Sequence, residues 1–357
     1  MKKKLTFLGI ETSCDETAAS IVQENSDGTA NILSSVVSSQ VNEHKKFGGV
    51  VPELAARSHV ENIDFIINQA ISESKFDFDM IDGVAATAGP GLVVCLSVGL
   101  NIGKSIAGFK QKPFIAVNHL EGHALSPTLE ENIQFPYLLL LISGGHSQYL
   151  IVNGVNSYKQ LGTTIDDALG EAFDKTAKII GLGYPGGPAL EKFAGDGNMH
   201  FYKLPEPIIN KGGCNLSFAG LKTAVLRESK KLNGNLNLRK NLAASFQKTV
   251  NNILTKKTLV AMNQFQNFSK KNSSFVIAGG VAANKTIREN LKKIAIENNF
   301  NPIFPNPKFC GDNAAMIAWA GIQRFKINLI DDLSFKVKSR WPLDSKAPYM
   351  KGPGLKI

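Results

Sequence analysis

Two histidines four residues apart are the strongest sign of chemistry in this sequence. His119 and His123 stand in Asn118-His-Leu-Glu-Gly-His123, after an asparagine, a residue that caps helices well. Four residues advance an α-helix by about 400°, so both imidazoles are expected on one face, where they could share a cation. Glu121 would point away from them, which excludes the HExxH arrangement of zinc proteases. Two histidines packed without metal are the open alternative.

A helix pair supplies only two ligands, so a carboxylate from elsewhere is expected to complete a metal site. The candidate is Asp312, in Cys310-Gly-Asp-Asn-Ala-Ala-Met316. It precedes an alanine-rich segment that predicts a helix. An N-cap role for Asp312 is therefore equally compatible with the pattern.

Glycine pairs mark three places where an anionic ligand could approach the backbone. Ser143-Gly-Gly-His146 lies between two strand-like runs, and its N–H groups are open to phosphate or carboxylate. Ala278-Gly-Gly-Val-Ala-Ala-Asn284 joins a strand-like run to a helix expected near Asn284, an order typical of nucleotide sites. Gly183-Tyr-Pro-Gly-Gly187 follows a helix expected from Thr164 to Gly181. Ordinary turns are the alternative.

The elements that must position these residues repeat one device. Leu5–Ile10 and Thr17–Val22 flank the polar turn that runs from Glu11 to Glu16, and Pro136–Ile142 and Gln148–Val152 flank Ser143–His146. Each half continues with helix-like segments between strand-like runs, which predicts an α/β protein of two similar lobes that enclose a cleft. We expect an N-terminal lobe over residues 1–125, a C-terminal lobe over 126–330 with loops near 181–213, and a tail over 331–357.

Charge divides the chain unevenly. Residues 1–202 hold 14 basic and 22 acidic residues, a net −8, whereas residues 203–357 hold 26 and 8, a net +18. Such asymmetry indicates a polyanionic partner, nucleic acid first, although solubility alone is the alternative. The basic clusters are at Lys222, Arg227, Lys230, Lys231, Arg239 and Lys240.

Four scattered cysteines form no CxxC pair and predict a reduced, cytoplasmic location. The sequence contains no run of about 18 apolar residues, so no membrane span is predicted.

Taken in order, nine segments resemble the bacterial tRNA N6-adenosine threonylcarbamoyltransferase family, formerly called O-sialoglycoprotein endopeptidases. The resemblance spans residues 5 to about 342. It rests on Gly9-Ile-Glu-Thr-Ser-Cys-Asp-Glu-Thr17, Gly48-Gly-Val-Val-Pro-Glu-Leu-Ala55, Thr87-Ala-Gly-Pro-Gly-Leu92, His119-Leu-Glu-Gly-His123, Ser143-Gly-Gly-His-Ser-Gln148, Gly170-Glu-Ala-Phe-Asp-Lys175, Gly183-Tyr-Pro-Gly-Gly-Pro188, Ala278-Gly-Gly-Val-Ala-Ala-Asn284 and Cys310-Gly-Asp-Asn313.

The resemblance implies an actin-like ATPase-domain fold of the sugar kinase, Hsp70 and actin type, with two RNase H-like lobes. It implies transfer of a threonylcarbamoyl group from threonylcarbamoyl-AMP to the N6 amine of the adenosine 3′-adjacent to the anticodon, in tRNAs that read codons beginning with A. It also implies two partner subunits, an inactive paralogue and a small P-loop ATPase, and no membrane.

By the same resemblance, His119, His123 and Asp312 hold one divalent metal ion, iron first and zinc as the alternative. The implied substrate site consists of Leu141, Ile142, Ser143, Gly144, Gly145, Asp174, Gly187 and Asn284. A carboxylate is expected to take the proton of the attacking amine, and Asp15 and Glu16 in the first hairpin are the candidates.

Two other functions stay open. A small-molecule kinase of the same superfamily would share the phosphate hairpins, but it would usually carry Asp where this chain has Glu11 and would not need His119 and His123. A non-catalytic scaffold of a tRNA-modifying complex would not depend on metal.

Overall fold

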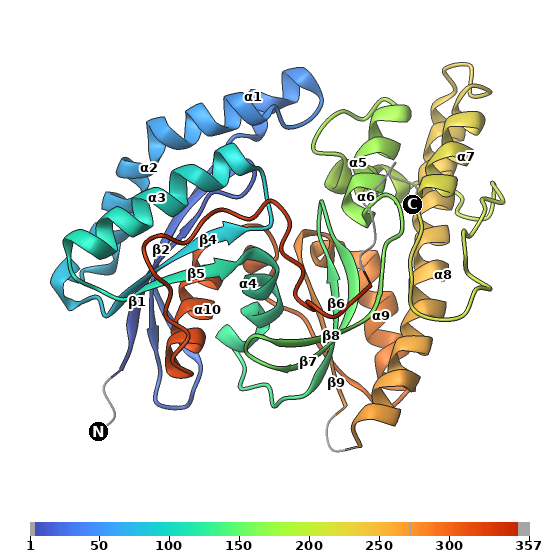
Figure 1. The fold of residues 1–357 in the computed structure, drawn as a ribbon. Helices are drawn as coiled ribbons and strands as arrows, with labels where there is room; N and C mark the ends of the chain where they lie inside the picture. The colour runs from blue at the N-terminus through green and yellow to red at the C-terminus, as the bar shows by residue number, and fades with distance from the viewer. Residues whose placement is uncertain (1–3, 271–272, 349–357) are drawn as a thin grey trace. The chain divides into compact units, whose positions relative to one another are not determined.

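Each of the two expected hairpins opens a five-stranded mixed sheet, and the two sheets have the same strand order. The computed structural model describes residues 4–270 and 273–348 (Figure 1). The first sheet runs β3 (Ala30–Ser39), β2 (Glu16–Glu24), β1 (Thr6–Glu11), β4 (Gly83–Gly89), β5 (Phe114–Asn118). The second runs β8 (Ser157–Thr163), β7 (Ser147–Gly154), β6 (Tyr137–Ile142), β9 (Ser274–Ala278), β10 (Asn301–Ile303).

Strand directions repeat as well. β1 pairs antiparallel with β2 and parallel with β4, and β6 pairs antiparallel with β7 and parallel with β9. The strands β5 and β10 continue the parallel part of each sheet. The duplicated α/β lobe predicted from the two hairpins is therefore confirmed.

Two units contain these sheets, and their boundaries differ from those expected. Unit 1 includes the chain up to Gln134, Gly154–Ser157 and Pro305–Ser345; unit 2 includes Phe135–Asn153 and Tyr158–Phe304. The expected C-terminal lobe, 126–330, thus loses its last part to unit 1. The physical reason is helix α10 (Ala314–Lys326), which buries an apolar surface including Trp319 among residues of β1, β4 and β5.

The remaining helices follow the strands along the chain. Unit 1 holds α1 (Val41–His44), α2 (Pro52–Ser74), α3 (Val93–Phe109) and α4 (His119–Leu125), with 3-10 turns η1 (Lys45–Phe47), η2 (Phe78–Met80), η3 (Ser126–Leu129) and η5 (Pro307–Phe309). Unit 2 holds α5 (Leu169–Ile179), α6 (Gly186–Ala194), α7 (Ala219–Ser229), α8 (Leu236–Phe268) and α9 (Lys285–Glu297), with the 3-10 turn η4 (Gly280–Ala283).

In unit 1, helices cover both faces of the sheet. Side chains of α2 and α3 pack with one face of β1 and β4, and side chains of α4, η3 and α10 pack with the other. Gly9 in β1 permits the close approach of α10, because a Cβ there would lie 2.2 Å from the carbonyl oxygen of Ala314. This packing brings the start of α10 to the carboxyl end of β1, where the polar turn begins.

Two expectations about elements of unit 2 need correction. The loop-rich stretch 181–213 contains the helix α6, which Leu190 anchors by full burial. The helix expected from Thr164 begins at Leu169, because Asp166 and Asp167 bond residues outside it, among them Ser217 and Lys222.

The tail expected over 331–357 is in part tied to unit 1. Residues 331–345 belong to that unit, and Asp331 pairs with Phe114 of β5. Residues 349–357 lie outside the described residues. Among helices that the structure describes, none is long and apolar enough to cross a membrane.

Candidate metal centre

Helix α4 carries both predicted histidine ligands. It begins at His119, directly after β5, and the Asn118 side chain accepts a hydrogen bond from Leu120 N at 2.9 Å, as expected of an N-cap. The two imidazole rings lie edge to face with centroids 4.7 Å apart. The helix predicted from this sequence is therefore confirmed, and both rings lie on one of its faces.

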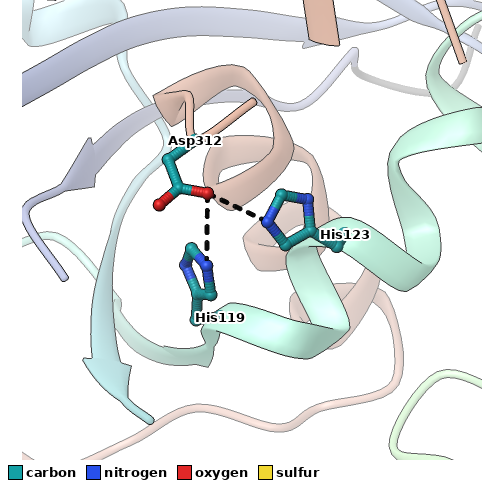
Figure 2. Close-up of side chains that lie close together, drawn as sticks. All are labelled: His119, His123 and Asp312. Atoms are coloured by element: carbon teal, nitrogen blue, oxygen red, sulfur yellow. Dashed lines mark hydrogen bonds and ion pairs between the residues drawn. The ribbon is translucent and has the colours of Figure 1, made fainter. Parts of the chain in front are cut away.

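Asp312 joins the two histidines from the loop before α10. Its Oδ1 lies 3.0 Å from His123 Nε2 and 3.4 Å from His119 Nε2 (Figure 2). The N-cap of α10 is Asn313, whose side chain accepts from Met316 N at 3.0 Å. The alternative N-cap role for Asp312 is therefore wrong, and its carboxylate faces the histidines instead.

Glu11, at the end of β1, orients His119 from behind. Its Oε2 lies 3.0 Å from His119 Nδ1, and the carboxylate also accepts from Thr87 Oγ1 and Ser13 N at 2.5 Å each. A carboxylate that accepts the Nδ1 proton of a histidine fixes its tautomer and leaves Nε2 for a metal. Nε2 of His119 is the atom that faces Asp312. The sequence pattern did not identify this role of Glu11, although an acidic residue at the end of a buried apolar strand was a signal.

The charges around His119 favour a cation. Burial alone would lower the pKa of His119, but the carboxylates of Asp312 and Glu11 raise it well above its ordinary value. Burial by itself would raise the pKa of Asp312. The charge of His119 and the hydrogen bonds from both histidines outweigh burial, so the pKa of Asp312 is lowered. A metal ion that binds here must displace the proton.

The three donors fit a divalent metal ion. Their ligand atoms all lie within 4.8 Å of one another, and His123 Nδ1 is buried with no hydrogen-bond partner among the described residues. Two imidazoles with one carboxylate are a donor set used for iron(II) and, with an open position, for catalytic zinc.

The predicted proton acceptors lie near this cluster. Asp15 is buried in the β1–β2 turn, and Glu16 opens β2 half-buried. Burial and then the charges of Asp312 and Asp15 raise the pKa of Glu16 to about 10. A bound cation would oppose that shift, because positive charge favours the ionised carboxylate.

A second buried network, which the sequence pattern did not reveal, holds the same turn. His59 Nε2 lies 3.1 Å from the carbonyl oxygen of Cys14, so this nitrogen carries the proton. His59 Nδ1 lies 2.7 Å from Thr17 Oγ1 and 3.3 Å from Gln40 Nε2, and Gln40 Oε1 accepts from His44 Nε2 at 3.1 Å. The network ties α1 and α2 to the residues on either side of Asp15 and Glu16.

Glu121, on α4, does not face the metal ligands. Its carboxylate accepts from Arg324 Nη1 at 2.7 Å and from Asn156 N at 2.7 Å. Glu121 and Arg324 are both buried, so each compensates the charge of the other. Glu121 thus anchors α4 to α10, and the expectation that it points away from the metal is confirmed.

In unit 2, the glycine turn after β6 is open. Gly144 and Gly145 are exposed, and a side chain added at either would meet no described atom within 4 Å. Ser143 holds the turn, since its N–H donates to His146 O at 2.8 Å. Leu141 and Ile142 are fully buried in β6, so their side chains face the core.

The other predicted substrate residues already bond the protein. Asp174 Oδ1 accepts from Gly186 N at 2.8 Å and Gly187 N at 3.3 Å, at the start of α6. Asn284 caps α9 by accepting from Ile287 N at 2.9 Å, and its amide pairs with Gln247 at 3.3 Å. Their direct use by a substrate stays a prediction.

Solved structures resemble this fold. HypF from T. kodakarensis aligns with TM-score 0.58 at 12% identity, covering 92% of this chain and 48% of that one. Component A of the (R)-2-hydroxyglutaryl-CoA dehydratase of Acidaminococcus fermentans aligns with TM-score 0.51 at 14% identity, covering 88% and 96%. With the duplicated sheets, these likenesses confirm the actin-like ATPase-domain fold. Within this fold, the chain carries a His–His–Asp cluster whose donor atoms could hold a metal ion.

Sequence relatives define the family. The family model for tRNA N6-adenosine threonylcarbamoyltransferase matches residues 31–319. A protein of that name from Pelagibacter ubique is 58% identical over 358 residues, all of both chains, and one from Rhodospirillum rubrum is 48% identical over 99% of each. The chain belongs to the tRNA N6-adenosine threonylcarbamoyltransferase family, a family of transferases.

Proposed function

We propose that this chain transfers the threonylcarbamoyl group of threonylcarbamoyl-AMP to the N6 amine of the adenosine 3′-adjacent to the anticodon, in tRNAs that read codons beginning with A. The observation that carries the proposal is the His119–His123–Asp312 cluster, braced by Glu11, in a chain similar over its full length to transferases of that name. The reaction forms a bond from N6 to the carbamoyl carbon and breaks the bond from that carbon to the phosphate oxygen of AMP.

His119, His123 and Asp312 would hold the metal, with iron first and zinc as the alternative. When bound, the ion supplies Lewis-acid stabilisation of oxygen charge that develops during transfer. Glu11 keeps His119 Nε2 directed at this position through the Nδ1 hydrogen bond. The positions of the three ligands therefore determine where developing negative charge on a substrate oxygen would be stabilised.

Proton transfer is assigned to the first hairpin. The exocyclic amine of adenine is a weak nucleophile, so its proton must leave as the new bond forms. Asp15 and Glu16 follow Glu11 in the β1–β2 hairpin, and we assign the proton to one of these two carboxylates. We propose that the adenylate is held by the open glycine turn at residues 143–145 together with Asp174, Gly187 and Asn284. Leu141 and Ile142 contribute only through β6, the strand that positions this turn.

Partner subunits would dock on unit 1. Exposed apolar side chains lie on α2 and α3, among them Val60, Phe65 and Phe109. A partner that covered these side chains would remove their apolar area from water. We propose that the inactive paralogue binds here and that the small P-loop ATPase joins the same complex. We also propose that the complex acts in the cytoplasm, because the four cysteines are free and free thiols are stable in that reducing compartment.

The test replaces both histidines. His119→Ala/His123→Ala is expected to lose bound metal and to form no modified nucleoside from tRNA and threonylcarbamoyl-AMP, because two of three ligands are gone. Metal analysis and mass spectrometry of tRNA nucleosides measure both, and His200→Ala, at an exposed histidine, is the matched control.

Other outcomes contradict the proposal. Unchanged metal content and unchanged modification in the double variant would exclude the metal centre. Modification by the intact complex without metal dependence would favour a scaffold, and a phosphorylated small molecule formed from ATP without tRNA would favour a kinase.

A further inference from the structure

The last described part of unit 1 forms a basic strip beside the metal centre, which we define as residues 333–341. It contains Lys336, Lys338 and Arg340 and no acidic residue. The rest of unit 1 is different in charge, since that unit as a whole has 16 Lys and Arg against 20 Asp and Glu. A local concentration of cations attracts anions and raises their concentration near this surface.

The backbone of the strip is fixed. Lys338 N donates to Ala88 O at 2.8 Å, Asn118 Nδ2 donates to Trp341 O at 2.9 Å, and Lys104 Nζ donates to Phe335 O. Gly89 has φ +146°, and a Cβ at this position would lie 1.9 Å from the carbonyl oxygen of Lys338. The strip therefore passes against the end of β4 at a distance that only glycine permits.

Burial alternates along the strip. Phe335, Val337 and Trp341 pack against the core between the sheet and helices α2 and α3. The lysines between them are exposed, and Lys338 Nζ lies 4.5 Å from the centre of the Trp341 ring. Lys336 makes no ion pair with any residue that the structure describes. The apolar residues anchor the strip, and the cations project to solvent from a backbone that is already ordered.

The strip touches the elements that build the metal cluster. Asn118, which donates to Trp341, is the N-cap of α4 and precedes His119. Ala88, which accepts from Lys338, follows Thr87, which donates to Glu11. Both contacts lie within unit 1. An anionic chain bound along the strip would thus run next to the position of the metal.

We propose that the basic strip binds the phosphate backbone of the tRNA and guides the strand to be modified past the metal centre. Lysines at alternate residues of a fixed segment suit a strand that carries one charge per nucleotide, and such contacts position nucleic acid without reading its sequence. The proposal rests on the proposed function only for the identity of the ligand as tRNA.

The cations of unit 2 are less suited to this role. Lys222 pairs with Asp167, Lys231 with Glu228 and Lys240 with Asp196. Arg239 donates to the carbonyl oxygens of Ile180 and Gly181. Most of the cations expected to face tRNA thus already hold the protein's own groups.

The test is the full-length double variant Lys336→Ala/Lys338→Ala, with Lys292→Ala/Lys293→Ala on α9 as the control that removes the same charge from exposed lysines elsewhere. In the strip variant we expect the Kd for tRNA to rise about tenfold and the slope of log Kd against log salt to fall by about 0.7–0.9 per lysine. The KM for tRNA should rise with little change in kcat, and metal content and thermal unfolding should stay unchanged.

Each other result overturns the proposal. Equal weakening in both double variants would show an effect of net charge alone. Unchanged tRNA binding in the strip variant would show that tRNA does not contact the strip. A raised KM for threonylcarbamoyl-AMP with unchanged tRNA binding would assign the lysines to the adenylate phosphate. Direct tRNA binding separates these results from a failure of the proposed function, because that failure would remove nucleoside modification from the wild-type protein as well.

Discussion

At the scale of residues, proton positions in unit 1 follow from the hydrogen-bond partners. His59 must be neutral, since Nε2 donates to the Cys14 carbonyl and Nδ1 faces the donor Gln40 Nε2. Burial lowers the pKa of His59 below its ordinary value of 6.5, although the Cys14 hydrogen bond and the charges of Glu11 and Asp15 oppose this. The network therefore has a defined sensitivity to acid.

The sign follows from linkage. Below about pH 6.5 the unfolded chain binds a proton at His59, whereas the folded chain binds it only near its lower pKa. Between these two pKa values the free energy of unfolding therefore decreases as the pH decreases, and above about pH 6.5 His59 adds no pH dependence. In His59→Gln, which keeps an amide donor for the Cys14 carbonyl, the difference in unfolding free energy between about pH 7.5 and about pH 5.5 should shrink. Denaturant unfolding at both pH values measures it.

The control for this prediction is His200→Gln, because the side chain of His200 is exposed. An acid loss of stability equal in His59→Gln and wild type would show that His59 does not titrate in the window.

At the scale of elements, two neighbouring residues at the start of α10 have separate tasks. Asn313 caps the helix, and Asp312 faces the histidines of α4. The sequence left Asp312 open between a metal ligand and the N-cap of this helix, because Asp is a good N-cap. Only the direction in which the loop enters α10 decided this.

The pair predicts a separation of effects. Asn313→Ala should lower the unfolding free energy by about 1 kcal/mol, because the Met316 N–H loses its acceptor. Asp312→Asn should lose metal affinity, whereas Asn313→Ala should keep it, because Asn313 caps α10 and is not one of the three donors. Denaturant unfolding in the presence of a chelator and metal titration measure the two. A loss of metal affinity in Asn313→Ala as great as in Asp312→Asn would contradict the assignment.

At the scale of the whole molecule, the uneven charge of −8 and +18 has several origins. Some basic residues compensate acidic ones, as Lys222 does for the buried Asp167. Others are exposed, among them Arg227 on α7, Lys230 just after that helix and the lysines of the basic strip. We expect Lys230→Glu/Lys231→Glu to weaken tRNA binding less than loss of the strip lysines, and to lower the salt slope without changing metal content. Titration of tRNA at several salt concentrations measures this.

Arg239 is not a clean probe of that surface. It donates to the last carbonyls around the end of α5, so Arg239→Glu should also destabilise unit 2. Stronger tRNA binding in Lys230→Glu/Lys231→Glu than in wild type would show that this surface repels rather than attracts tRNA.

By itself, the sequence determined the two hairpins, the α/β class, the pair His119 and His123 and the candidate Asp312, because these follow from local periodicity and residue type. The tertiary structure decided which residues complete the site. Glu11 and His119 are 108 residues apart and His123 and Asp312 are 189 apart. Such contacts depend on how β1, α4 and α10 pack together, and no spacing along the chain encodes them. The return of Pro305–Ser345 to unit 1, with the basic strip at its end, was decided in the same way: α10 buries its apolar surface on the first sheet, and the residues after it follow.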